Sequence, residues 1–197
     1  MRGERRRLVV GLSGASGAPL ALACLEELRR HPEWEIHLIV SGGAAETLRW
    51  ETNCSLEELK ALAHTCYEMD QIGAAPASGT FPTEGMLIVP CSMKTVAGIC
   101  SGYADNLMLR AADVTIKEGR PLVLVARESP LSAIHLRNLA ELSRIPGITI
   151  LPPMMTFYNR PATLEEMTHH MVCKMLERFG IQPEDFRRWS GDADNQI

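Results

Sequence analysis

Long apolar runs are missing from this chain of 197 residues, and so is any surplus of positive charge. No apolar run approaches the roughly 18 residues that a membrane-spanning helix needs. Lys and Arg number 20 against 24 Asp and Glu, so no basic excess is available to neutralise a nucleic-acid backbone. The basic start is followed by only five apolar or glycine residues before Ser13, too few for the core of a signal peptide. We therefore expect a cytoplasmic protein that binds neither membranes nor nucleic acids.

Cysteine pairs at metal-binding spacing are also missing. None of the six cysteines forms a Cys-x-x-Cys pair, and their spacing fits neither a disulfide framework nor a zinc site. No Asp-rich repeat of the kind that collects magnesium around a diphosphate is present either. These absences favour reduced, mostly buried thiols and a protein without a metal. The cysteines are Cys24, Cys54, Cys66, Cys91, Cys100 and Cys173.

What the sequence does contain is a regular alternation of short apolar runs and amphipathic segments. The runs are typical of strands buried on both faces, and the segments between them are typical of helices. This order predicts a single α/β domain over residues 1–197, a three-layer, doubly wound parallel sheet of the flavodoxin-like or Rossmann-like kind. Strands are predicted at 8–12, 35–40, 86–89, 122–126 and 148–151, and the main helices at 19–30, 44–50, 56–66, 107–117, 132–143 and 164–179.

Ligands of such folds bind beyond the carboxyl ends of the strands, so the loops at those ends are the candidate site. The first loop, Ser13–Gly17, consists of small residues that let backbone approach a phosphate or a ring, and it leads into a helix N-terminus. Its spacing, Gly11-x-x-Gly14-x-x-Gly17, does not match the dinucleotide fingerprint, and the second strand ends in Ser41 rather than an acid. Both departures argue against NAD and leave a mononucleotide such as FMN open. A tight turn that needs small residues explains the loop about as well.

Two further loops carry polar groups at the same edge. The segment Cys91–Thr95 places two hydroxyls and several backbone donors at the start of a helix, which suits an anion, although capping alone would use Ser92 and Thr95 in the same way. Arg127 can bind a phosphate through two hydrogen bonds, and Glu128 could move a proton.

Other charged and aromatic residues are harder to interpret alone. Arg110 and Lys117 are seven residues apart and so share a helix face, which most often means a solvated surface. Tyr158 and Lys174 are isolated, and an isolated Tyr or Lys is usually structural.

At these loops the sequence resembles the UbiX family of flavin prenyltransferases. Each matching segment is weak alone, but they follow the family's order over nearly the whole chain. The segments are Gly11–Gly17, Val40–Ser41, Glu51–Thr52, Pro76–Gly79, Pro90–Thr95, Arg110–Asp113, Lys117–Glu118, Pro121–Glu128, Phe157–Tyr158 and Arg188–Trp189.

The resemblance implies a flavodoxin-like enzyme that transfers a dimethylallyl group from dimethylallyl monophosphate to reduced FMN without a metal. It also implies a homo-oligomer, dodecameric in known members, and delivery of the prenylated FMN to a UbiD-type decarboxylase. By position, FMN should contact Gly14, Ala15, Ser16, Ser41, Ser92, Met93, Lys94, Thr95 and Arg127. The donor's phosphate should meet Arg110, Lys117, Glu128, Tyr158 and Lys174, and the reacting centre should contain Ser16, Glu51, Glu128, Lys117 and Trp189.

The implied chemistry suits these side chains. Cations and a phenol can stabilise a departing phosphate without a metal, and the π-face of Trp189 can stabilise positive character on the allyl fragment. Ring closure needs proton movement, for which Glu128, Glu51, Ser16 and the released phosphate remain alternatives. Some family members have Arg where this chain has Lys174. Lysine keeps the positive charge but cannot form the bidentate hydrogen bonds of a guanidinium group.

Two rival functions use the same fold. An FMN-dependent oxidative decarboxylase of cysteine-containing substrates would need a catalytic His near the flavin, and its Pro-x-Met-Asn signature is not evident, since Pro153 is followed by Met-Met-Thr. A non-catalytic FMN carrier would need no cationic pocket beyond the one that holds FMN.

Overall fold

The computed structural model describes residues 5–189, so both ends of the expected domain, 1–4 and 190–197, lie outside the described residues. Six strands form one sheet in the order β3-β2-β1-β4-β5-β6, and every neighbouring pair is parallel. The predicted parallel α/β architecture is therefore confirmed. The strands are β1 (Arg6–Leu12), β2 (Trp34–Val40), β3 (Thr65–Tyr67), β4 (Gly85–Cys91), β5 (Leu122–Ala126) and β6 (Ile148–Ile150).

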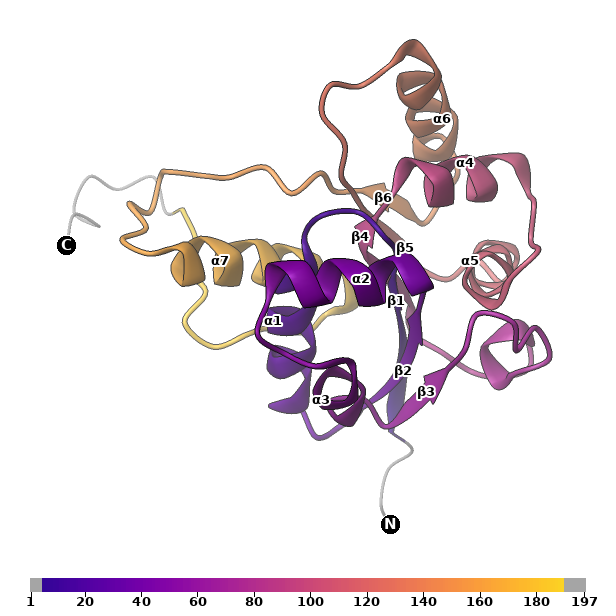
Figure 1. Cartoon of the computed structure of the whole chain (residues 1–197), viewed down its shortest axis with the longest axis horizontal. Coiled ribbons are helices and arrows are strands. Elements are labelled where there is room, and N and C mark those ends of the chain that lie inside the picture. The colour runs from indigo at the N-terminus through magenta and orange to yellow at the C-terminus, as the bar shows by residue number, and fades with distance from the viewer. Residues whose placement is uncertain (1–4, 190–197) are drawn as a thin grey trace.

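Helices cover both faces of the sheet, because its strands are apolar on both sides. Along β1, Val10 packs into one core and Val9 into the other, and both are almost completely buried. Burying a side chain of this size stabilises the fold by roughly 1.5–3 kcal/mol. One face packs against α1 (Ala18–Arg29), α2 (Gly42–Glu51), α3 (Leu56–Ala61) and α7 (Leu164–Leu176), and the other against α4 (Met93–Ser101), α5 (Leu107–Lys117) and α6 (Ala133–Ser143) (Figure 1).

The strand order places the topological switch between β1 and β4. These strands are far apart in the sequence but pair directly, with Val10 opposite Leu87. Strands to one side of this pair are β2 and β3, and strands to the other side are β5 and β6. The loops that leave β1 and β4 therefore diverge to opposite faces of the sheet at its carboxyl edge, which is where such folds bind ligands.

Three predicted boundaries were wrong. The helix expected over 56–66 ends at Ala61, and the short edge strand β3 follows it, because Thr65 and its neighbours pair with β2. Tertiary pairing overrides a weak local signal in so short a strand. Strand β4 continues through Pro90 to Cys91, with a shift of register after Ile88. The last helix ends at residue 176 and continues only as the 3-10 turn η2 (Glu177–Phe179); a second such turn, η1 (Ala75–Ala77), lies in the loop before β4.

Two parts of the chain project from the sheet. The connection between β6 and α7 extends away from the core before the chain turns back, and α6 stands beyond the end of the sheet beside α4 (Figure 1). Along that connection the side chains of Met154, Met155, Phe157 and Tyr158 are exposed. Within residues 5–189, no helix is both long and apolar enough to cross a bilayer.

Candidate active site

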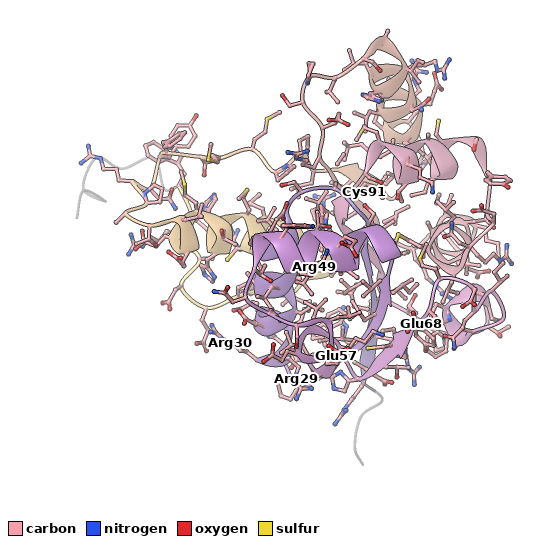
Figure 2. All side chains as sticks on the ribbon, in the orientation of Figure 1. Arg29, Arg30, Arg49, Glu57, Glu68 and Cys91 are labelled. Atoms are coloured by element: carbon pink, nitrogen blue, oxygen red, sulfur yellow. The ribbon has the colours of Figure 1, made fainter. Side chains whose placement is uncertain are left out.

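A buried serine joins the two loops at the switch point. The Ser13 hydroxyl, which directly follows β1, donates to the carbonyl oxygen of Pro90 at 2.8 Å and accepts from the backbone N–H of Ser92 at 2.7 Å. Ser13 is 2% exposed, and its bond to the Pro90 carbonyl is buried. They fix the ends of β1 and β4 relative to each other. Figure 2 marks Cys91 at this edge of the sheet and Arg29, Arg30 and Glu57 at the opposite edge.

Glu51 reaches the same edge of the sheet from the last turn of α2. One of its carboxylate oxygens accepts from the backbone N–H groups of Gly17 and Ala18, both at 2.8 Å. These N–H groups begin α1, so the carboxylate neutralises the positive end of that helix. The sequence suggested that the start of α1 could bind a ligand's anion. In the structure a residue of the chain itself takes that position.

The surroundings of Glu51 determine its protonation. Burial would raise the pKa of the carboxyl, but hydrogen bonds from the Ser16 hydroxyl and from the two α1 N–H groups lower it, and so does the charge of Arg127. The net pKa lies below the ordinary value, so Glu51 is ionised at neutral pH. The arrangement brings Ser16, Glu51 and Arg127 together, three residues that the sequence assigned to the site from three separate segments.

Backbone N–H groups that have no acceptor suit a flavin mononucleotide. Among residues 5–189, the backbone N–H groups of Gly14, Ala15 and Ser16 find no acceptor, and neither do those of Met93 and Lys94 at the start of α4. A helix N-terminus with free N–H groups is suited to a phosphate, and amides beside a small-residue loop are suited to the polar edge of a ring.

The loop Gly14–Ser16 packs closely on the start of a neighbouring helix. A Cβ added to Gly14 would lie 3.0 Å from the Cα of Gly43, so the loop after β1 rests directly on the start of α2. This contact leaves no room for a side chain at Gly14.

The hydroxyls at the edge have structural partners. Ser41 caps α2, and Ser92 caps α4 while its hydroxyl lies 3.1 Å from that of Thr95. Met93 is 8% exposed, so its backbone rather than its side chain is available to a ligand. Burial raises the pKa of the Cys91 thiol far above its usual range, which agrees with the interpretation that it is a buried thiol and not a nucleophile.

A second group of predicted residues gathers around the end of α7. The rings of Tyr158 and Trp189 are 5.6 Å apart between centroids. Lys174 donates to Glu177 at 2.9 Å, and Arg188 pairs with the same carboxylate. Glu177 is thereby ionised, with a pKa lowered first by the hydrogen bonds from Arg188 and Lys174. The sequence indicated Arg188 only as part of a motif and gave no sign that it shares the Glu177 carboxylate with Lys174.

Three more predicted residues each have a partner close to them in the sequence. Lys117 ends α5 just before β5, which places it at the amino edge of the sheet, and it pairs with Glu118. Arg110 forms an ion pair with Asp113 at 2.6 Å. Glu128 is exposed and accepts from the N–H of Ser129 at 3.0 Å. A single chain therefore does not bring Lys117 to the carboxyl-edge loops that contain Ser16 and Arg127.

Comparison with known proteins now decides the family. Residues 2–176 match the Flavoprotein family. The flavin prenyltransferase LpdB of Lactiplantibacillus plantarum is 51% identical over 187 residues, which is 95% of this chain and all of that protein. The chain belongs to the UbiX-like flavin prenyltransferases.

Solved structures of UbiX-like proteins superpose closely on this fold. AnUbiX (PadA1), solved in complex with FMN and dimethylallyl pyrophosphate, has a TM-score of 0.93 and 45% identity and covers 95% of this chain and 99% of its own. A dodecameric FMN-dependent UbiX-like decarboxylase from Escherichia coli O157:H7 has a TM-score of 0.92 and 49% identity, covering 94% and 100%. The resemblance read from the sequence and the fold class are both confirmed.

Proposed function

We propose that this chain is a flavin prenyltransferase that transfers a dimethylallyl group from dimethylallyl monophosphate to reduced FMN. The observation that supports this most directly is identity near one half, over almost the full length, to a flavin prenyltransferase. The free backbone donors around Ser16 and at the start of α4 support the same proposal, because they suit FMN. Bound reduced FMN supplies the nucleophilic ring positions that form bonds to the allyl group.

The chain's own residues have three tasks in this proposal. The loop Gly14–Ser16 and the α4 N-terminus hold FMN, together with Ser41, Lys94, Thr95 and Arg127. The cations Lys117, Lys174 and Arg110 and the hydroxyl of Tyr158 bind the donor's phosphate and stabilise its departure by preorganised charge. Trp189 faces the allyl fragment, whose positive character its π-face stabilises. We propose that residues 1–197 form one domain that provides all of these groups.

Proton transfer is assigned to a carboxylate at the carboxyl edge of the sheet. Glu51 is already engaged by two N–H groups and has a lowered pKa, so it is a weak base. Glu128 is exposed at the same edge and its carboxylate has only one backbone partner among the described residues. We therefore favour Glu128 as the group that moves the proton, with Glu51 and Ser16 orienting the reacting centre.

The donor pocket needs more than one chain in this proposal. Lys117 is at the amino edge of the sheet, whereas Glu51 and Arg127 are at the carboxyl edge. Exposed apolar side chains at Met154, Met155 and Phe157 offer a surface for a second copy. A dodecamer, the assembly of the E. coli O157:H7 protein, would bring such sites together. We also propose that a UbiD-type decarboxylase receives the product.

The test is anaerobic incubation of the protein with reduced FMN and dimethylallyl monophosphate, followed by mass measurement of the flavin. The expected result is a flavin heavier by one dimethylallyl unit, which then activates an apo UbiD-type decarboxylase. FMN-loaded, assembled protein that leaves the flavin mass unchanged would contradict the proposal. Decarboxylation of a cysteine-containing peptide in the same preparation would favour the rival enzyme class.

A further inference from the structure

The segment Gly79–Thr83, which precedes β4, lies against the end of α5. A Cβ added to Gly79 would lie 2.7 Å from the ammonium nitrogen of Lys117 and closer still to the carboxylate of Glu118. The Gly79 backbone therefore packs directly on the ion pair that these two side chains form. Any side chain at Gly79 would have to displace the ammonium group.

Arg120 holds this segment in place. Its guanidinium donates to the carbonyl oxygen of Gly79 at 2.8 Å, to that of Phe81 at 3.0 Å and to the hydroxyl of Thr83 at 3.3 Å. A planar guanidinium with several fixed donors can bind three acceptors of one segment, which an ammonium group cannot do in the same geometry. Arg120 thus ties residues 79–83 to the turn that follows α5.

The other side of the segment is fixed by aromatic packing. The Phe81 ring meets the buried ring of His37 edge-on at 5.0 Å between centroids, and the Arg7 guanidinium lies 5.1 Å from its face. Phe81 is therefore anchored on β1 and β2 while its carbonyl oxygen is bound to Arg120. The segment is held from both sides, so it can act as a rigid support.

The segment supports the ammonium group of Lys117. Its side chain is 47% exposed and has a flexible four-carbon stem, so without contacts it would sample many rotamers before meeting a phosphate. Glu118 pairs with it, and the pKa of Glu118 is lowered by the hydrogen bond and charge of Lys117 and further by Arg120. The ammonium is confined between the Glu118 carboxylate and the Gly79 backbone.

We propose that Gly79 and Arg120 are positioning residues for the prenyl donor: Arg120 holds the Gly79–Thr83 segment against Lys117, and this contact sets where the Lys117 ammonium meets the donor's phosphate. The inference rests on the proposed function, in which Lys117 binds that phosphate. Preorganising a flexible cation lowers the ordering cost of binding, so its loss should appear in the KM for the donor.

The test compares Gly79→Ala with Gly73→Ala, a control in the same loop where an added Cβ meets nothing within 4 Å. The atoms that Gly79→Ala displaces are the ends of two flexible side chains, so the fold should be kept. Steady-state assays with dimethylallyl monophosphate should show KM raised about tenfold, the equivalent of about 1.4 kcal/mol. The Kd for FMN and the thermal midpoint should stay unchanged, and Gly73→Ala should match the wild type in every measurement.

Three further variants distinguish the outcomes. Lys117→Met should raise KM at least as much as Gly79→Ala, and adding Gly79→Ala to Lys117→Met should change nothing more, because both act through one ammonium group. Arg120→Lys keeps the positive charge but loses the planar guanidinium that binds three acceptors, so it should raise KM as Gly79→Ala does. If Gly79→Ala does not fold, Arg120→Lys takes its place in the test.

Failure of the inference and failure of the proposed function look different. Folded Gly79→Ala and Arg120→Lys with wild-type KM, beside Lys117→Met with raised KM, would overturn the inference alone. An equal effect of Gly79→Ala in the Lys117→Met background would also overturn it. A wild-type KM for Lys117→Met would remove the phosphate role of Lys117 and the inference with it, and a wild-type protein that forms no prenylated flavin would refute the proposed function itself.

Discussion

Replacing Glu51 with glutamine tests the arrangement at the start of α1. The variant Glu51→Gln keeps an oxygen for the N–H groups of Gly17 and Ala18, removes the charge and replaces the second carboxylate oxygen with an NH2 group. Hydrogen bonds to charged groups stabilise a fold by about 1 kcal/mol more than hydrogen bonds between neutral groups. A favourable charge at a helix terminus contributes roughly 0.3–1 kcal/mol of further stability. Because Glu51 is partly exposed, solvent screening reduces the sum. We expect a loss of about 1 kcal/mol in unfolding free energy at pH 7.

The loss should be visible in thermal unfolding and should depend on pH. For a chain of this size, about 1 kcal/mol corresponds to a fall in Tm of about 2–4 °C. The folded-state pKa of Glu51 lies below its ordinary value of 4.5, so the carboxylate stabilises the fold above that value and the contribution fades as pH falls through the folded pKa. The Tm difference between wild type and Glu51→Gln should therefore be constant from pH 7 to about pH 5 and shrink below pH 4.5.

The control is Glu46→Gln on the same helix. Glu46 is exposed and pairs with Arg49 on the surface, an interaction that is worth at most about 1 kcal/mol and often nothing. Its Tm should stay close to that of the wild type. A Tm for Glu51→Gln equal to that of the wild type at pH 7, or a difference that persists unchanged at pH 4, would refute the helix-capping role of the carboxylate.

Three more changes probe other parts of the site. Glu128→Gln should retain FMN, measured by quenching of flavin fluorescence, while turnover falls about 100-fold or more, the typical worth of general acid–base catalysis; lost FMN binding would indicate a structural role instead. Ser13→Ala removes the buried hydroxyl that binds the Pro90 carbonyl and the Ser92 N–H, and it should lower the unfolding free energy by about 1–3 kcal/mol in urea titration; an unchanged midpoint would contradict the bridge between β1 and β4. Trp189→Ala removes the ring that packs on Tyr158 and should reduce kcat for the donor without changing the Kd for FMN, whereas unchanged kinetics would exclude the ring from the pocket.

Most of the fold was predictable because its strands are apolar on both faces. Runs such as 8–12 and 122–126 have no polar residue, and the structure buries them in a parallel sheet. The edge strand β3 was missed because its three residues are only half buried and continue directly from a helical pattern. These residues form a strand because they pair with β2. The pairing joins positions 28 residues apart in the sequence, such as His37 and Thr65, and local patterns do not encode it.

The sequence predicted those parts of the site that lie in the loops at the carboxyl ends of the strands. The carboxyl ends of neighbouring parallel strands meet at one edge, so the order of strands and loops along the chain was enough to group Ser16 with Arg127. The partner of Glu51 could not be predicted in this way. Nothing in the sequence indicates that this carboxylate turns back to the start of α1, a contact between residues 34 positions apart.

Lys117 is separated from the loops at the carboxyl edge of the sheet, and this separation bears on the proposed catalysis. Lys117 is on the amino edge of the sheet and Glu51 is on the carboxyl edge, and a stable sheet cannot bend to bring its two edges together. If Lys117 and Glu51 act on one donor molecule, the phosphate of that donor must lie between the carboxyl-edge loops of one chain and the end of α5 in another chain. Assembly then completes the active site, and each subunit supplies cations to a reaction centre that it does not contain. The exposed apolar side chains between β6 and α7 agree with this, because burying them between copies would stabilise the contacts that such a shared site requires.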